Sequence, residues 1–144
     1  MSYPTLPIGA ELKEQLALKY HSRRNLMLIG DHGIGKTEFL KSLADDLGIK
    51  FIPLNLTIME SYDLNGFPIP DAANDVVRYL PPNRLPKPGA GPGILLADEL
   101  NRAMKDVQNA ILQLATDRRF NDYVFPDDWI IATSMNPDNG QNNV

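Results

Sequence analysis

The residues best suited to chemistry lie in one short loop. Positions 30–37 read Gly-Asp-His-Gly-Ile-Gly-Lys-Thr, which fits the pattern G-x-x-x-x-G-K-[ST]. Its glycines allow successive backbone N–H groups to point at a phosphate, and a helix that starts at its end adds a positive pole. Lys36 would then reach the β- and γ-phosphates, and the Thr37 hydroxyl would bind Mg²⁺. The pattern therefore predicts a site for nucleotide phosphates.

The whole loop is expected to surround the phosphates. Asp31 and His32 stand at variable positions of the pattern, so their side chains are expected to be solvated bystanders. The alternative is an ordinary glycine-rich turn with a lysine in the following helix. The phosphate site is favoured because the pattern is long and lies between a strand and a helix. The predicted binding residues are Gly30, Asp31, His32, Gly33, Ile34, Gly35, Lys36 and Thr37.

An acidic pair follows another apolar run. Asp98 and Glu99 come directly after residues 94–97, Ile-Leu-Leu-Ala. The carboxyl ends of parallel strands face the same crevice, so we expect this pair beside the loop. Asp98 is predicted to hold Mg²⁺, mostly through its bound water, and Glu99 to polarise the water that attacks the γ-phosphorus. The alternative is that one of these acids caps the next helix.

A single amide ends a further apolar run. Asn136 follows residues 129–134, Trp-Ile-Ile-Ala-Thr-Ser. At a strand end beside the other two groups, its amide would hydrogen-bond the γ-phosphate or the attacking water and so sense whether the phosphate is present. The alternative is that Asn136-Pro137 starts a turn, which this dipeptide often does.

The elements that must position these residues alternate along the chain. Apolar spacing predicts helices over 10–20, 37–47 and 103–117, with Gly48 as the stop of the second. Apolar runs predict strands over 26–29, 51–56, 93–97 and 129–134. The first strand is expected to be buried on both faces, and Pro53 predicts a bulge or a sheet edge in the second. This order predicts an α/β fold with an open, mostly parallel sheet.

Two further segments are predicted to be irregular. The stretch 67–92 is rich in proline and glycine, which excludes a long helix. Its apolar residues favour an ordered insertion with a short hairpin over the alternative, a disordered linker. Residues 118–125 predict a second small hairpin that turns at Asn121-Asp122.

Composition limits the function classes. The chain has 144 residues, 43% of them apolar, which suits one globular domain. Its net charge of −4 gives no basic field for nucleic acid or an anionic membrane, so neither partner is expected. The absence of cysteine excludes disulfides and thiolate sites and fits a cytoplasmic location. Neither a signal peptide nor an apolar run of about 18 residues is present.

Together these motifs resemble those of the AAA+ ATPases, in particular the MoxR-like branch. The loop 30–37 resembles Walker A, and residues 94–103, ILLADELNRA, resemble Walker B with that branch's extension. Residues 131–137, IATSMNP, resemble the sensor 1 strand. Residues 63–66, DLNG, resemble the element that precedes the helix 2 insertion. The similarity runs from about residue 5 to residue 137.

The resemblance implies a hexameric ring that binds ATP and Mg²⁺ between subunits. ATP hydrolysis in such rings moves loops that remodel a client protein, as a chaperone does, often together with a von Willebrand A-type partner. The resemblance also implies that 67–92 holds the helix 2 insertion and that 118–125 is the hairpin before sensor 1. Arg102 would lie near a subunit boundary; the alternative is an ordinary surface salt bridge.

The resemblance also implies elements beyond sensor 1. A full AAA+ module continues with a fifth strand, an arginine finger and a helical lid that carries sensor 2, and this sequence ends before them. The resemblance therefore implies the three-layer P-loop NTPase fold with a mostly parallel sheet, and we expect residues 1–144 to form one partial large α/β subdomain of it, an incomplete core without the lid. Because arginine fingers contribute about 10³ to 10⁵ in rate, this chain should bind nucleotide better than it hydrolyses it. A piece of a longer protein and a naturally short relative both fit the sequence.

Two other functions stay open. One is a nucleotide-gated assembly module with little intrinsic hydrolysis. The other is a P-loop kinase, or a nucleic-acid-linked motor or restriction-type NTPase, which shares parts of these motifs. The preference for ATP over GTP follows from the resemblance alone, because no base-reading residue is identifiable.

Overall fold

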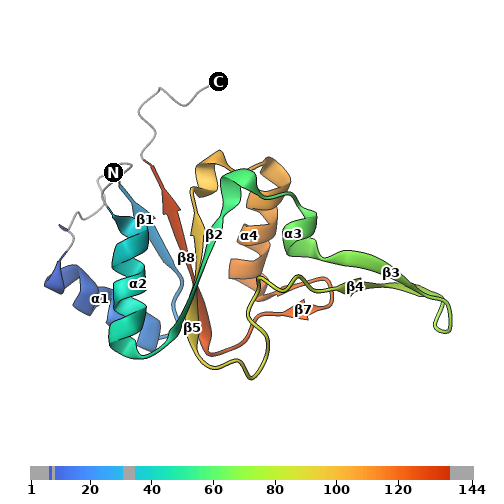
Figure 1. Ribbon diagram of the computed structural model, residues 1–144, viewed down its shortest axis with the longest axis horizontal. Coiled ribbons are helices and arrows are strands. Elements are labelled where there is room, and N and C mark those ends of the chain that lie inside the picture. Colours follow the sequence, from blue (N-terminus) through green and yellow to red (C-terminus); the bar gives the residue numbers. More distant parts are fainter. Residues whose placement is uncertain (1–6, 8, 31–34, 137–144) are drawn as a thin grey trace.

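The computed structural model describes residues 7, 9–30 and 35–136. A four-stranded sheet runs through its centre in the order β1 (Leu26–Ile29), β8 (Trp129–Met135), β5 (Gly93–Asp98) and β2 (Lys50–Asn55) (Figure 1). All three strand pairings are parallel. The predicted α/β fold with a mostly parallel sheet is therefore confirmed.

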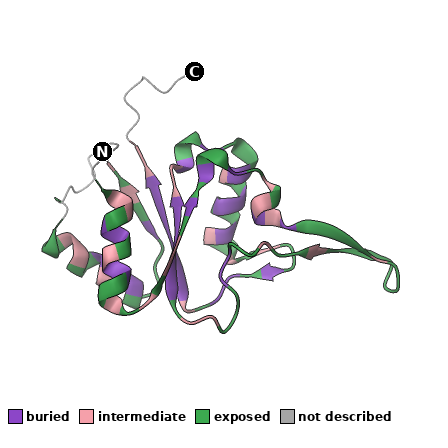
Figure 2. Ribbon diagram, viewed as in Figure 1, coloured by how far each residue is buried: buried purple, intermediate pink, exposed green. Residues whose placement is uncertain are grey.

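Helices cover the two faces of this sheet. The helices α1 (Ala10–His21) and α2 (Lys36–Leu47) lie on one face, and α4 (Lys105–Asp117) lies on the other (Figure 1). Successive side chains of a strand point to opposite faces. Accordingly Ile94 of β5 packs in the cluster of α1 and α2, whereas Leu95 packs in the cluster of α4. Figure 2 shows the central strands buried between these layers.

The first strand is less buried than the sequence predicts. Leu26 and Leu28 pack toward α1 and α2, but Met27 and Ile29 are 54% and 48% exposed. The prediction that β1 is buried on both faces is therefore wrong. In the described part of the chain β1 lies at the edge of the sheet, beside β8 alone. A continuous apolar run does not distinguish such a strand from a central one.

The second strand is also an edge strand. Pro53 pairs with Leu96 in a register that runs without interruption from Lys50 to Asn55. Pro53 therefore marks an edge and not a bulge, which decides between the two alternatives. The strand begins at Lys50, one residue before the predicted start, and Leu56 already belongs to the 3₁₀ turn η1 (Leu56–Ile58).

The last helix starts later than predicted. A 3₁₀ turn, η2 (Leu100–Arg102), follows β5, and Ala103 then adopts an extended conformation. α4 begins only at Lys105. Ala103 is nonetheless buried in the same apolar cluster as Val107, so the apolar spacing extends beyond the helix itself. This explains why the pattern places the helix start two residues too early.

A long hairpin leaves the body of the molecule. The short helix α3 (Tyr62–Asn65) leads into the antiparallel strands β3 (Phe67–Asp71) and β4 (Val76–Leu80), which project away from the sheet (Figure 1). The return segment, 81–92, is held at the base of the sheet. There the Tyr123 hydroxyl donates to the Pro86 carbonyl at 2.5 Å, and the Trp129 indole N–H donates to the Gly91 carbonyl at 2.6 Å. The prediction of an ordered segment with a hairpin is confirmed.

The second predicted hairpin is also present. It consists of β6 (Arg119–Phe120) and β7 (Tyr123–Val124), and Asn121 in its turn has a φ of 52°. The carboxylate of Asp122 accepts a hydrogen bond from the Tyr79 backbone N–H at 2.8 Å, which joins the two hairpins. Across the described residues, every helix is too short or too polar to cross a membrane.

Candidate functional site

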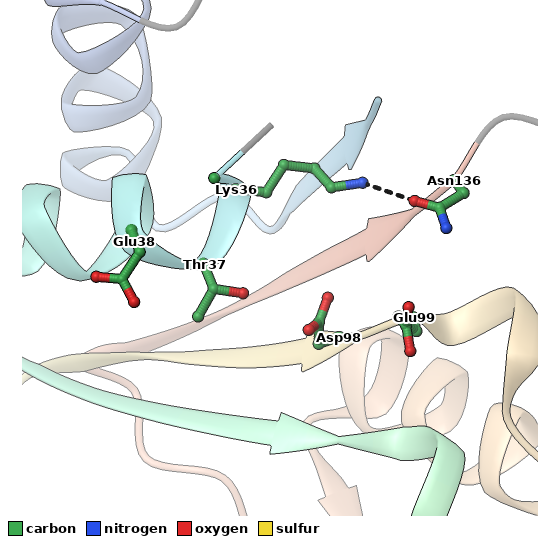
Figure 3. Close-up of a pocket in the computed structure, with 7 residues that line it drawn as sticks. Lys36, Thr37, Glu38, Asp98, Glu99 and Asn136 are labelled. Atoms are coloured by element: carbon green, nitrogen blue, oxygen red, sulfur yellow. Dashed lines mark hydrogen bonds between the residues drawn. The ribbon is translucent and has the colours of Figure 1, made fainter. Parts of the chain in front are cut away.

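One cavity collects the three groups singled out in the sequence. It has a volume of about 200 Å³ and opens where β5 and β8 end and α2 begins (Figure 3). In a parallel sheet this edge gathers residues that are distant along the chain. The residues that line the cavity are Gly35, Lys36, Thr37, Glu38, Asp98, Glu99 and Asn136.

Lys36 ties the start of α2 to the sheet. Gly35, just before it, has a φ of 81°, a left-handed conformation that suits glycine. The Lys36 ammonium donates to the carbonyl oxygens of Gly30 at 2.6 Å and Met135 at 3.1 Å, and to Asn136 Oδ1 at 3.2 Å. Its positive charge is thereby held at the mouth of the cavity, in front of the N-terminal end of a 12-residue helix.

Two oxygen donors face the same opening from opposite sides. Thr37 comes from the first turn of α2, and Asp98 comes from the last residue of β5 (Figure 3). A hydroxyl and a carboxylate are the kinds of ligand that Mg²⁺ prefers. The donor chemistry of these two residues therefore fits a magnesium site.

Glu99 has a special backbone conformation. Its φ of 58° and ψ of 49° place a residue with a side chain in the left-handed region. The Arg102 guanidinium lies 3.9 Å from Glu99 Oε1, and the Glu99 side chain is only 17% exposed. The ordinary salt bridge weighed for Arg102 is thus present, while its place near a subunit boundary stays a prediction.

The alternative of the acidic pair as a helix cap is not supported. The residue that precedes α4 is Met104, and Glu99 makes no side-chain cap hydrogen bond to the short turn η2. Asp98 instead accepts a hydrogen bond from the Ser134 hydroxyl. Both acids therefore face the cavity and the neighbouring strand.

Asn136 is held from two sides. Its side-chain oxygen accepts from Lys36, and its backbone carbonyl accepts from the Asn101 side chain at 3.4 Å. The alternative that Asn136-Pro137 starts a turn involves Pro137, which lies outside the described residues, as do the loop residues Asp31, His32, Gly33 and Ile34.

Three contributors were not foreseen from the sequence. Glu38 lines the cavity, Asn101 holds the Asn136 backbone, and Ser134 is buried against the acidic pair. The position of Glu38, directly after Thr37 in the first helical turn, was a usable signal. The roles of Asn101 and Ser134 depend on the pairing of β5 with β8, which no local pattern reveals.

A family comparison gives a clear match. The family described as AAA domain (dynein-related subfamily) matches residues 25–144. These residues include the whole loop, the acidic pair and Asn136. A comparison with curated proteins found no match.

Solved structures show the same fold. A "putative ATPase" from Cytophaga hutchinsonii has a TM-score of 0.63 at 21% identity, over 89% of this chain and 38% of that one. A RuvB mutant from Thermotoga maritima has a TM-score of 0.59 at 16% identity, over 90% and 39%. NtrX from Brucella abortus has a TM-score of 0.58 at 17% identity, over 97% and 32%. This chain thus spans less than two fifths of each of these structures.

Proposed function

The chain belongs to the dynein-related subfamily of AAA domains, and from that premise we propose that it binds ATP with Mg²⁺ and hydrolyses it. The observation that carries the proposal is the single cavity that Lys36, Thr37, Asp98, Glu99 and Asn136 share. Each of these side chains has a chemical type suited to a different part of a magnesium–nucleotide complex.

The phosphates would be bound by the start of α2. Its first backbone N–H groups and the helix dipole favour an anion there, and the Lys36 ammonium adds a full positive charge. Lys36 already bridges the ends of β1 and β8, so its charge is held beside the start of α2, and a phosphate oxygen would take the place of one of its present acceptors. The loop residues 31–34 would supply further N–H groups, as their sequence pattern predicts.

The metal would be held by Thr37 and Asp98. The hydroxyl of Thr37 would bind Mg²⁺ directly, and Asp98 would bind it mostly through water. When bound, the ion neutralises phosphate charge and polarises the phosphoryl oxygens. The protein contributes the fixed direction of these two donors on opposite sides of the cavity.

Glu99 and Asn136 would act on the attacking water. The Glu99 carboxylate would orient this water and accept its proton, a role that suits a carboxylate held at a strand end. Asn136 would hydrogen-bond the γ-phosphate or the water. Its contact with Lys36 couples such sensing to the residue that binds the phosphates.

The finer assignment rests on the motifs. We propose a MoxR-like protein that acts as a hexameric ring and remodels or assembles client complexes, possessing 67–92 as its helix 2 insertion and 118–125 as the hairpin before sensor 1. The exposed apolar residues of the β3–β4 hairpin suit a client-facing role. Residues 1–144 would form part of its large α/β subdomain. A von Willebrand A-type partner, the place of Arg102 at a subunit boundary and a cytoplasmic location stay predictions.

The Glu99→Gln variant tests the proposal. It keeps the size of the side chain but removes the base, so ATP binding should match the wild type while phosphate release falls by about 10²-fold or more. Binding is measured by isothermal titration and hydrolysis by phosphate release, with Glu60→Gln, an exposed acid outside the cavity, as the control. Equal phosphate release from both variants would contradict the catalytic role. Nucleotide-dependent self-association with negligible phosphate release, even at high protein concentration, would favour the assembly module instead.

A further inference from the structure

Ser134 is a polar residue inside the core. It lies on β8 and is only 1% exposed, between layers of apolar side chains. A hydroxyl removed from water destabilises the protein unless hydrogen bonds replace those lost to water. Its contacts therefore show what holds a polar group at this position.

The Ser134 hydroxyl contacts both residues of the acidic pair. It donates a hydrogen bond to Asp98 Oδ1 and accepts one from the Glu99 backbone N–H at 3.3 Å. One hydroxyl can do both, because it has one hydrogen and two lone pairs. Ser134 is thus bonded to the side chain of one acid and to the backbone of the next.

We propose that Ser134 is a positioning residue for magnesium–nucleotide binding: it fixes the Asp98 carboxylate and the backbone of Glu99. The inference rests on the proposed function, in which Asp98 holds Mg²⁺. A carboxylate with one oxygen held by a hydroxyl presents its other oxygen to a cation in a defined direction. Ser134 itself touches neither nucleotide nor metal in this proposal.

The backbone of Glu99 supports the same inference. This residue lies in the left-handed region, where residues with a side chain are uncommon. Ser134 Oγ accepts from its N–H, and its carbonyl accepts from the Arg102 N–H at 3.0 Å. Both backbone groups of Glu99, its N–H and its carbonyl, are therefore hydrogen-bonded in this conformation. Ser134 on β8 provides the acceptor for the N–H.

A neighbouring residue offers a matched control. Thr133 is also on β8 and is 7% exposed, but its hydroxyl donates to the Leu26 carbonyl of β1 at 3.3 Å. Both residues have a buried hydroxyl with a hydrogen bond to an adjacent strand. Only the bonds of Ser134 reach the acidic pair, so a general loss of core hydrogen bonding and a loss of positioning can be told apart.

The test measures how strongly Mg²⁺ promotes nucleotide binding. Wild-type chain, Ser134→Ala, Ser134→Thr and Thr133→Val are titrated with β,γ-imido-ATP, in EDTA and over a series of Mg²⁺ concentrations. Thermal unfolding of each variant without nucleotide reports its stability. If Ser134→Ala does not fold, Ser134→Cys replaces it, because a thiol is a much weaker donor.

We expect Ser134→Ala to reduce the promotion by Mg²⁺ by about 10-fold or more, the usual effect of losing a group that orients a metal ligand. Its affinity in EDTA should stay that of the wild type, and Ser134→Thr should restore the Mg²⁺ response. Thr133→Val should lower the unfolding temperature and keep the wild-type Mg²⁺ response.

Two results would overturn the inference alone. One is a wild-type Mg²⁺ response in folded Ser134→Ala, and the other is an equal loss of that response in Thr133→Val. If the wild-type chain binds no nucleotide in either condition, the proposed function fails and the inference falls with it. The wild-type titration therefore separates the two failures.

Discussion

The Nζ atom of Lys36 lies 3.2 Å from the Oδ1 atom of Asn136, a residue 100 positions further along the chain. The same ammonium also bonds the carbonyl oxygens of Gly30 and Met135. The start of α2 and the ends of β1 and β8 are therefore joined through one side chain. In the proposed function, a phosphate that attracts the ammonium would also change the hydrogen bonding of Asn136, and phosphate binding would thereby affect the end of β8.

Lys36→Ala should abolish most nucleotide binding. Hydrogen bonds to a charged group contribute about 1.5–3 kcal/mol each, so the affinity for ATP should fall by about 10- to 100-fold. The comparison is Lys41→Ala, which removes an exposed lysine from the same helix and should leave the affinity unchanged. Isothermal titration of both variants checks this, and similar affinities for the two would disprove the role of Lys36.

Asn136→Asp should discriminate between ATP and ADP. If the Asn136 side chain faces the γ-phosphate, a new negative charge there repels ATP more than ADP. We expect the added charge to disfavour ATP over ADP by about 1.4 kcal/mol or more. The ratio of the two affinities should therefore change by about 10-fold or more.

The ratio is the informative quantity for Asn136→Asp. Pairing of the new carboxylate with Lys36 would weaken the binding of both nucleotides and leave their ratio unaltered. Asn101→Asp serves as the control, because the Asn101 side chain donates to the backbone carbonyl of Asn136 and not to its side-chain amide. A constant ratio in Asn136→Asp would place the amide away from the γ-phosphate.

Gly93→Ala should destabilise the fold. A Cβ atom on Gly93 would lie 2.4 Å from Cη2 of the buried Trp129, closer than atoms pack. We expect the free energy of unfolding to fall by about 1–3 kcal/mol in urea denaturation. In a Trp129→Phe background, which lacks the contacted ring atoms, the same substitution should cost less. An identical cost in both backgrounds would show that the strain arises elsewhere.

Tyr123→Phe should loosen the 81–92 segment. The variant loses the hydrogen bond to the Pro86 carbonyl, so the free energy of unfolding at pH 7 should fall by about 1 kcal/mol. Urea denaturation of this variant and of Tyr62→Phe, which alters an exposed tyrosine, measures the difference. An equal loss in both variants would contradict an anchoring role for Tyr123.

The same residue predicts a pH dependence. Burial raises the pKa of the Tyr123 hydroxyl above its ordinary value of 10.0, and the Arg118 charge opposes this in part. A group whose pKa is raised by folding contributes its stability fully below the unfolded-state pKa. That stability is lost as the pH rises from about 10 through the folded-state pKa. The free energy of unfolding of Tyr123→Phe should therefore fall less than that of the wild type between about pH 9 and pH 12. We expect the two decreases to differ by about 1 kcal/mol.

Local sequence patterns predicted most of the helices and strands. The apolar run Leu26–Ile29 predicted a strand, and the spacing from Leu40 to Leu47 predicted a helix, because both signals depend on neighbours in sequence. What local patterns missed is the environment of each element. The exposure of Met27 depends on which strand flanks β1, and the extended conformation of Ala103 depends on how the chain leaves the acidic pair.

The candidate site shows the same division. Lys36, Thr37, Asp98 and Asn136 were predictable because residue type and position at an element boundary indicated their chemistry. Ser134 was not, because a hydroxyl inside an apolar strand has no distinctive spacing. Its contact with Asp98 follows from the parallel register of β5 and β8, which pairs Ala97 with Thr133.

The prolines of the projecting hairpin have a consequence for self-association. The Tyr79 N–H bonds Asp122 and not β3, so Tyr79 and its partner Pro68 form a pair whose backbone groups point outward. Pro70, two residues on, has the same orientation. Because proline has no N–H, the outer edge of β3 lacks donors where an added strand would need them. The hairpin can thus expose apolar side chains to water with little risk of seeding strand-by-strand aggregation along this edge.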